Sequence, residues 1–182
     1  MLKKMWLPIL LLLPVSIMAQ TTVTPDKHVL AMQRMLMKLI AAAPGNFANI
    51  KGAQESQQGN AVFYKANLTA TVTDAAEMKE VLATDFFGAM QTADDHIVVR
   101  PEGTIYLARY ADDAEFSITD MVTQVFTSMP DYIGKANAKI EKVAGPTANQ
   151  SIYILTYNNT VVGTLNCDSK AATSAIIIGI RK

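Results

Sequence analysis

Residues 96–110, HIVVRPEGTIYLARY, predict a β-hairpin and with it an antiparallel sheet. Pro101 suits the second position of a β-turn, and Gly103 tolerates the positive φ that such turns require. Ile97 and Val99 before the turn, and Ile105 and Leu107 after it, stand at the alternate positions of a strand that share one face. We expect a register that brings apolar residues opposite one another, with the pairs Arg100–Thr104, Val99–Ile105, Ile97–Leu107 and Asp95–Arg109.

A second alternating stretch, residues 62–72, predicts a strand with one face toward a core and the other toward solvent. This pattern is typical of antiparallel sheets. Residues 54–60, QESQQGN, are polar and predict a loop. Further strands are expected at 139–143, 151–157, 160–167 and 175–180, and the unbroken apolar run of the last predicts a central strand covered on both faces.

Three helices are expected from apolar residues repeated at steps of three and four, over residues 24–43, 74–90 and 117–129. Pro44-Gly45 and Pro130 end the first and third helices, and Ser117 with Asp120 forms a capping pair at the start of the third. Two successive halves, each a helix followed by strands, are conceivable, with the second starting near Phe116. The sequence thus predicts an α+β fold, a single mostly antiparallel sheet with two or three helices packed on one face.

The first 19 residues have the three parts of a secretory signal peptide. Lys3 and Lys4 are followed by an apolar run that is shorter than the roughly 20 residues a transmembrane helix needs. The run ends at Ala19, after which we expect cleavage. Residues 20–182 then form a single exported domain, periplasmic or extracellular, with no stable membrane insertion after cleavage.

Charge and cysteine content exclude several classes of protein. The sequence has 16 basic and 16 acidic residues, and removing Lys3 and Lys4 leaves 14 basic residues and a net charge of about −2. A near-neutral chain without a basic run has no electrostatic basis for binding nucleic acid. Cys167 is the single cysteine, so no intrachain disulfide forms, and export without disulfides favours a bacterial envelope.

The ends of the predicted hairpin carry the best candidate metal site. The chain enters it through Asp94, Asp95 and His96 and leaves it through Asp112 and Asp113. Carboxylates are the ligands that Ca²⁺ prefers, and a histidine would suit a transition metal. The alternative is that these are solvated corner charges and that Asp112 or Asp113 caps the third helix.

A partner-binding surface is the other candidate site. Tyr106 and Tyr110 lie on one face of the predicted hairpin strand. If that face is exposed, the two rings are displayed, and exposed aromatic residues often anchor protein interfaces. The alternative is that the third helix covers them.

No catalytic motif and no cofactor are predicted, because Cys167, His28 and His96 have no sequence context that joins them into a nucleophile and base. The sequence therefore favours an exported, non-catalytic domain that binds a protein or another component of the envelope. The alternative is a small exported hydrolase or metal-dependent enzyme built on the acidic residues around His96.

Overall fold

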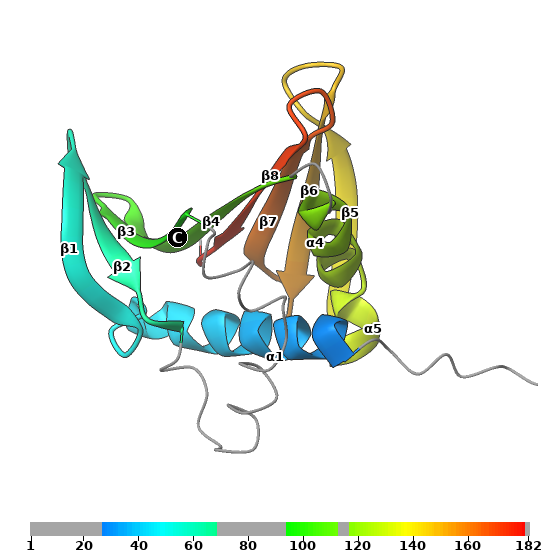
Figure 1. Ribbon diagram of the computed structural model, residues 1–182. Coiled ribbons are helices and arrows are strands. Elements are labelled where there is room, and N and C mark those ends of the chain that lie inside the picture. The colour runs from blue at the N-terminus through cyan, green and yellow to red at the C-terminus, as the bar shows by residue number, and fades with distance from the viewer. Residues whose placement is uncertain (1–26, 69–93, 113–116, 181–182) are drawn as a thin grey trace, which may run out of the picture.

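The computed structural model describes residues 27–68, 94–112 and 117–180 (Figure 1). The described chain begins with a helix, continues through four strands, passes two short helices and ends with four more strands. The elements are α1 (Lys27–Ala42), η1 (Ala43–Gly45), β1 (Lys51–Gln58), β2 (Ala61–Ala66), β3 (Asp94–Arg100), β4 (Gly103–Ala111), α4 (Ile118–Thr127), α5 (Met129–Ile133), β5 (Ala138–Ala144), β6 (Gln150–Tyr157), β7 (Thr160–Asp168) and β8 (Thr173–Ile178).

All eight strands belong to one antiparallel sheet in the order β1-β2-β3-β4-β8-β7-β6-β5. Strands β1–β4 form one meander and β5–β8 form a second, and each is preceded by helix. The last strands of the two meanders, β4 and β8, pair with each other at the centre of the sheet. The expected organisation in two helix-then-strand halves is therefore present in the described residues.

The expected α+β class is wrong, because the protein is mostly β. The eight-stranded antiparallel sheet contains far more of the described residues than the few helices do. Residues 54–60 were expected to form a loop, but residues 54–58 belong to β1. All eight residues of β1 are exposed, so no apolar periodicity in the sequence indicates a strand. The strand is formed by its antiparallel pairing with β2. The expected helix at 74–90 lies outside the described residues.

The strand expected at 62–72 is also shorter than its pattern indicates. Strand β2 ends at Ala66, and the next two residues are outside any strand, with Leu68 buried. Residues 69–72 of the expected strand lie outside the described residues. The four strands expected in the last third are confirmed as β5 to β8, and Asn158 and Asn159 form the turn between β6 and β7 with φ of 48° and 62°.

The hairpin of β3 and β4 is confirmed, but its register differs by one residue from the expected one. Arg100 pairs with Gly103 across a two-residue turn, and Ile97 pairs with Tyr106. Gly103, with φ of 140°, is already the first residue of β4. Cross-strand partners point to the same face of a sheet, so this shift places Ile97 and Tyr106 together.

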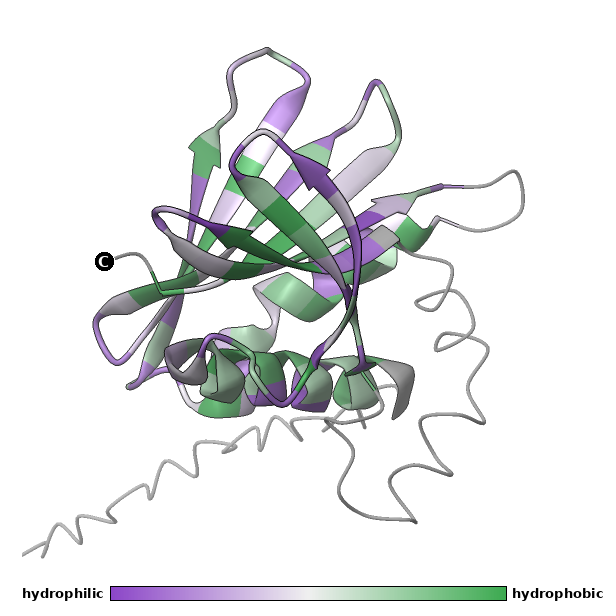
Figure 2. Cartoon of the chain, turned by 90° about the vertical axis from the view of Figure 1, so that its left-hand side faces the viewer, coloured by the Kyte–Doolittle hydropathy of each residue, from purple (hydrophilic) through white to green (hydrophobic). Residues whose placement is uncertain are grey.

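The core lies between one face of the sheet and helices α1 and α4. Tyr106, Leu155 and Ile178 on that face are fully buried, as are Leu36 of α1 and Phe126 of α4. The start of α4 matches the expected cap, because the Ser117 hydroxyl accepts a hydrogen bond from the Asp120 amide at 3.4 Å. Figure 2 shows hydrophobic residues concentrated in the middle of the strands and hydrophilic residues at the loops.

Candidate functional site

The face of the sheet that points away from the core is called the open face here. Successive side chains of a strand alternate between the two faces, so the neighbours of core residues belong to the open face. Among the described residues, no helix lies on it, and Figure 1 shows the sheet bent into a trough with α1 running beneath. The pairing registers place these residues on it: His96, Val98, Ile105, Leu107, Arg109, Ile152, Ile154, Thr164, Asn166, Ala175 and Ile177.

Much of the open face is apolar. Its middle row, read across the strands, contains Leu107, Ile177 and Ile154, with Thr164 between the last two. Leu107 is 5% exposed and Val98 is fully buried, although neither belongs to the core cluster. The apolar run of β8, expected to be covered on both faces, is buried on one face and half-buried on the other.

Two hollows lie along the central strands and are lined mainly by residues of this face, and the larger one also reaches Ile118 of α4. The larger, about 750 Å³, is at the end of β4 and the start of β8, and the smaller, about 360 Å³, is at the opposite end of these strands. The larger hollow exists because β8 presents small side chains here, Thr173 and Ala175, between the longer residues of β4, β6 and β7. The smaller hollow includes Gly179, which has no side chain, beside Ile105.

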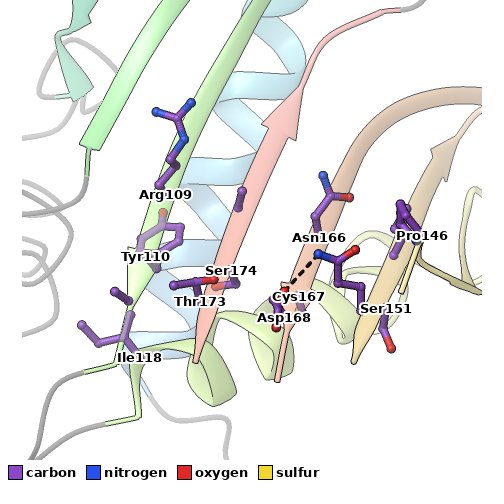
Figure 3. A pocket seen from close by; sticks show the side chains of 14 residues that line it. Arg109, Tyr110, Ile118, Pro146, Ser151, Asn166, Cys167, Asp168, Thr173 and Ser174 are labelled. Carbon is purple, nitrogen blue, oxygen red and sulfur yellow. Dashed lines mark hydrogen bonds between the residues drawn. The ribbon is translucent and has the colours of Figure 1, made fainter. Parts of the chain in front are cut away.

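Polar groups stand around the larger hollow (Figure 3). Arg109 rises from β4 on one side, and Asn166 of β7 stands across β8 on the other. The Asp168 carboxylate is already engaged, because it accepts hydrogen bonds from the Gln150 amide and from the backbone N–H of Lys170 and Ala171, each at 3.0 Å. These bonds lower the pKa of Asp168, with the Ala171 amide as the largest cause, and make it a turn-forming residue.

Of the expected metal site, the side chains of Asp95, His96 and Asp112 are described, and these three do not come together. Asp95 and His96 are adjacent on β3 and point to opposite faces. His96 Nε2 lies 2.9 Å from Glu55 Oε2 on β1. The Asp112 carboxylate instead accepts hydrogen bonds at the start of α4 from the Thr119 amide (2.8 Å), the Thr119 hydroxyl (2.8 Å) and the Ser117 hydroxyl (3.2 Å).

For the other two expected ligands, Asp94 and Asp113, the position of the side chain is not described. The backbone of Asp94 pairs with Arg109, and Asp113 lies outside the described residues. Within the described ranges, no three His, Cys, Asp or Glu side chains are close enough together to hold a metal ion. The expected alternative, a capping role for Asp112, matches the hydrogen bonds at α4.

Tyr106 and Tyr110 lie on the core face of β4 and are 0% and 4% exposed. Neither ring is displayed for a partner, which matches the alternative that the sequence left open. Burial raises the pKa of both hydroxyls well above the usual value. Their hydroxyl oxygens, and that of Ser174 on β8, make no hydrogen bond of good geometry with a described residue.

Asp95 lies on the same face as these tyrosines, and burial raises its pKa to about 6 against the lowering effect of nearby His96. The folded protein therefore binds more protons than the unfolded chain between pH 3.8 and about 6, and stability is lost as the pH rises through that window. Asp95→Asn is expected to be about 1 kcal/mol more stable than the wild type at pH 7.5, a value reduced for partial solvent access.

Urea denaturation at pH 3.5 and pH 7.5 measures this difference. The difference between the two proteins should become small at the lower pH, where the wild-type carboxyl is mostly protonated in both the folded and the unfolded state. A wild-type protein that keeps its full stability up to pH 7.5 would contradict the burial of this carboxyl.

Cys167 of β7 is half-buried, and its Sγ lies 3.4 Å from the Thr123 hydroxyl of α4. The described structure therefore places the thiol at the packing contact between α4 and the sheet. Sequence reasoning did not find the open-face hollows. The sequence feature that relates to the larger hollow is the small size of Thr173 and Ala175 compared with Ile177. It indicates a hollow only when the residues on the neighbouring strands are known.

Comparisons with known proteins provide no relative. No protein family model matches the chain, no curated protein matches it, and no solved structure matches the fold. Across the described residues, none of the helices has the length and apolar character required to span a lipid bilayer.

Proposed function

We propose that this protein is a non-catalytic binding module, exported by the leader at residues 1–19, that holds a protein partner on the open face of its sheet. One observation carries the proposal: the open face combines a partly exposed apolar row with two hollows. Protein interfaces typically have such an apolar centre surrounded by polar groups. Arg109, Asn166 and Gln150 supply polar groups at one end of the row.

The organisation of the sheet supports this use of the open face. The strands are anchored from the other side by the core, so the open face is presented on a rigid scaffold. A pre-formed surface loses little conformational entropy on binding. The enzyme alternative receives no support from the described residues, because Asp95 and His96 diverge and Asp112 is engaged at the start of α4.

Ile154→Lys tests the proposal, because it places a charge in the apolar row at a half-buried position of β6. Tyr132→Lys is the matched control, since Tyr132 is 39% exposed on α5, away from the open face. Each protein is immobilised and exposed to the envelope fraction and culture supernatant of its source cells, with and without a chelator, and captured proteins are quantified by mass spectrometry.

We expect the captured amount of a protein that binds the wild type and Tyr132→Lys to fall at least tenfold with Ile154→Lys, with or without the chelator. The reason is that a lysine side chain in the apolar row must lose its water when the partner binds. Equal capture by all three proteins would exclude the open face as the binding surface. Capture that depends on the chelator would indicate a metal-dependent interaction instead.

A further inference from the structure

Strand β5 forms one edge of the sheet and, among the described residues, pairs with β6 alone (Figure 1). Its pairing with β6 is regular from Ala138 to Ala144. Such an edge presents a row of backbone N–H and C=O groups to which another strand can bind. The opposite edge is less suited to this, because β1 pairs with β2 through two irregularities and its Glu55 contacts His96.

The hydrogen bonds around β5 show which of its backbone groups point outward. The Gly145 amide, just beyond the strand, donates to the Gln150 carbonyl at 3.0 Å. Odd-numbered residues of the strand therefore direct their backbone groups toward β6, and even-numbered residues direct theirs away from the sheet. The Ala138 amide already donates to the Gly134 carbonyl, so the first outward amide that is open belongs to Ile140.

Two opposite charges stand on either side of Ile140. Lys139 and Glu141 are exposed and Ile140 is half-buried. The two charged side chains are two positions apart on one strand, so they point to the same face of the sheet. Neither has an ion pair or a side-chain hydrogen bond within the described part of the chain.

These charges fit a second copy of the same strand. When two identical strands pair antiparallel around a two-fold axis, one residue lies opposite its own copy at the axis. With the axis at Ile140, Lys139 lies opposite Glu141 of the second copy on both sides of the axis. Opposite charges across a strand pair are stabilising, and like charges are destabilising. An axis at Lys139, Glu141 or Lys142 would place identical charges opposite each other, so the charge pattern selects the register centred on Ile140.

We propose that two copies of this chain associate through β5, in antiparallel pairing centred on Ile140, with Lys139 of each copy beside Glu141 of the other. Backbone hydrogen bonds and the contact between the two Ile140 side chains supply the attraction, and the exposed charges mainly set the register. The two sheets become continuous, which leaves both open faces on the same side. The inference concerns the sheet edge and does not rest on the proposed function.

Sedimentation velocity of the purified protein over a range of concentrations tests the association, and a reversible dimer is expected. Lys139→Glu and Glu141→Lys should each weaken the dimer at least tenfold, because each places like charges opposite one another. An equimolar mixture of these two variants should dimerise again, because every opposing pair across the interface is then of opposite sign. A chain that carries both substitutions should dimerise within about threefold of the wild type, for the same reason.

The register is tested with introduced cysteines. A short bismaleimide should join two copies of Ile140→Cys, whose thiols lie next to the axis. The matched control is Val143→Cys, also half-buried on β5. Its two thiols would be about 20 Å apart at roughly 3.3 Å per residue, so it should be joined no more than the wild type. Circular dichroism and thermal unfolding check that all variants fold.

Three results would overturn the inference. The first is a protein that stays monomeric at every concentration. The second is a dimer that Glu141→Lys leaves unchanged, or a mixture of the two charge variants that remains monomeric. The third is a dimer that is lost with Ile154→Lys but not with the β5 variants, which would place the second copy on the open face.

Discussion

Replacing Phe126 with alanine is expected to lower the free energy of unfolding by about 3–5 kcal/mol, which is among the largest effects a single substitution has in a protein of this kind. Phe126 is fully buried in α4, within the core that joins this helix to α1 and the sheet. The substitution removes an aromatic ring from the contact between α4, α1 and the sheet. It leaves a cavity that the surrounding side chains cannot fill completely.

Two further variants make this expectation testable even if Phe126→Ala is too unstable to purify. Phe126→Leu keeps most of the volume and should cost about 1–1.5 kcal/mol. Tyr132→Ala, at an exposed position of the next helix, should change stability by less than about 0.5 kcal/mol. Urea denaturation measures all three, and equal values for Phe126→Ala and Tyr132→Ala would show that α4 is not part of the core.

The second large effect is expected at Gly163 of β7, where the sheet leaves no room for a side chain. A Cβ at this position would lie 2.6 Å from Cδ1 of Ile178 and 3.1 Å from the carbonyl oxygen of Ile177 on β8. Gly163→Ala is therefore expected to destabilise the protein by about 1–3 kcal/mol, because neighbouring groups must shift within a packed core.

Gly45→Ala is the matched control, since a Cβ there would have no atom within 4 Å. It should leave stability unchanged or raise it by up to about 1 kcal/mol through the unfolded state. Adding Ile178→Val to Gly163→Ala should recover part of the loss, because it removes the Cδ1 atom that the new methyl group meets. Additive effects of the two substitutions in thermal unfolding would rule out this steric conflict.

The sequence predicts several elements of this protein well, and for local reasons. Four strands in the last third, the β3–β4 hairpin, the third helix and the Asn158-Asn159 turn are all present in the structure. Each depends on signals within a few residues: alternation, a capping serine, or residues that tolerate positive φ. The leader at residues 1–19 has the same local character and remains a prediction.

The candidate sites were harder to predict because they depend on register and on pairing of distant strands. The observed hairpin register differs by one residue from the expected one, so Ile97 pairs with Tyr106 and not with Leu107. Such a shift changes which residues of β4 lie on the same face of the sheet as Ile97. Asp95 and His96 were expected to converge with residues at the far end of the hairpin, but alternation along β3 separates them. Strand β1 escaped prediction because its stability comes from pairing with β2 and not from burial.

The amino-acid sequence by itself determined that this chain forms antiparallel strands with tight turns and a well-capped helix, since these follow from interactions between residues close together in the chain. The tertiary structure alone decided that β4 pairs with β8, that Tyr106 and Tyr110 face the core, and that Arg109 and Ala175 lie side by side around a hollow. The physical reason is that the core buries one face of the sheet as a whole. The side chains left on the other face are set by the alignment of all eight strands together, which no single stretch of sequence encodes.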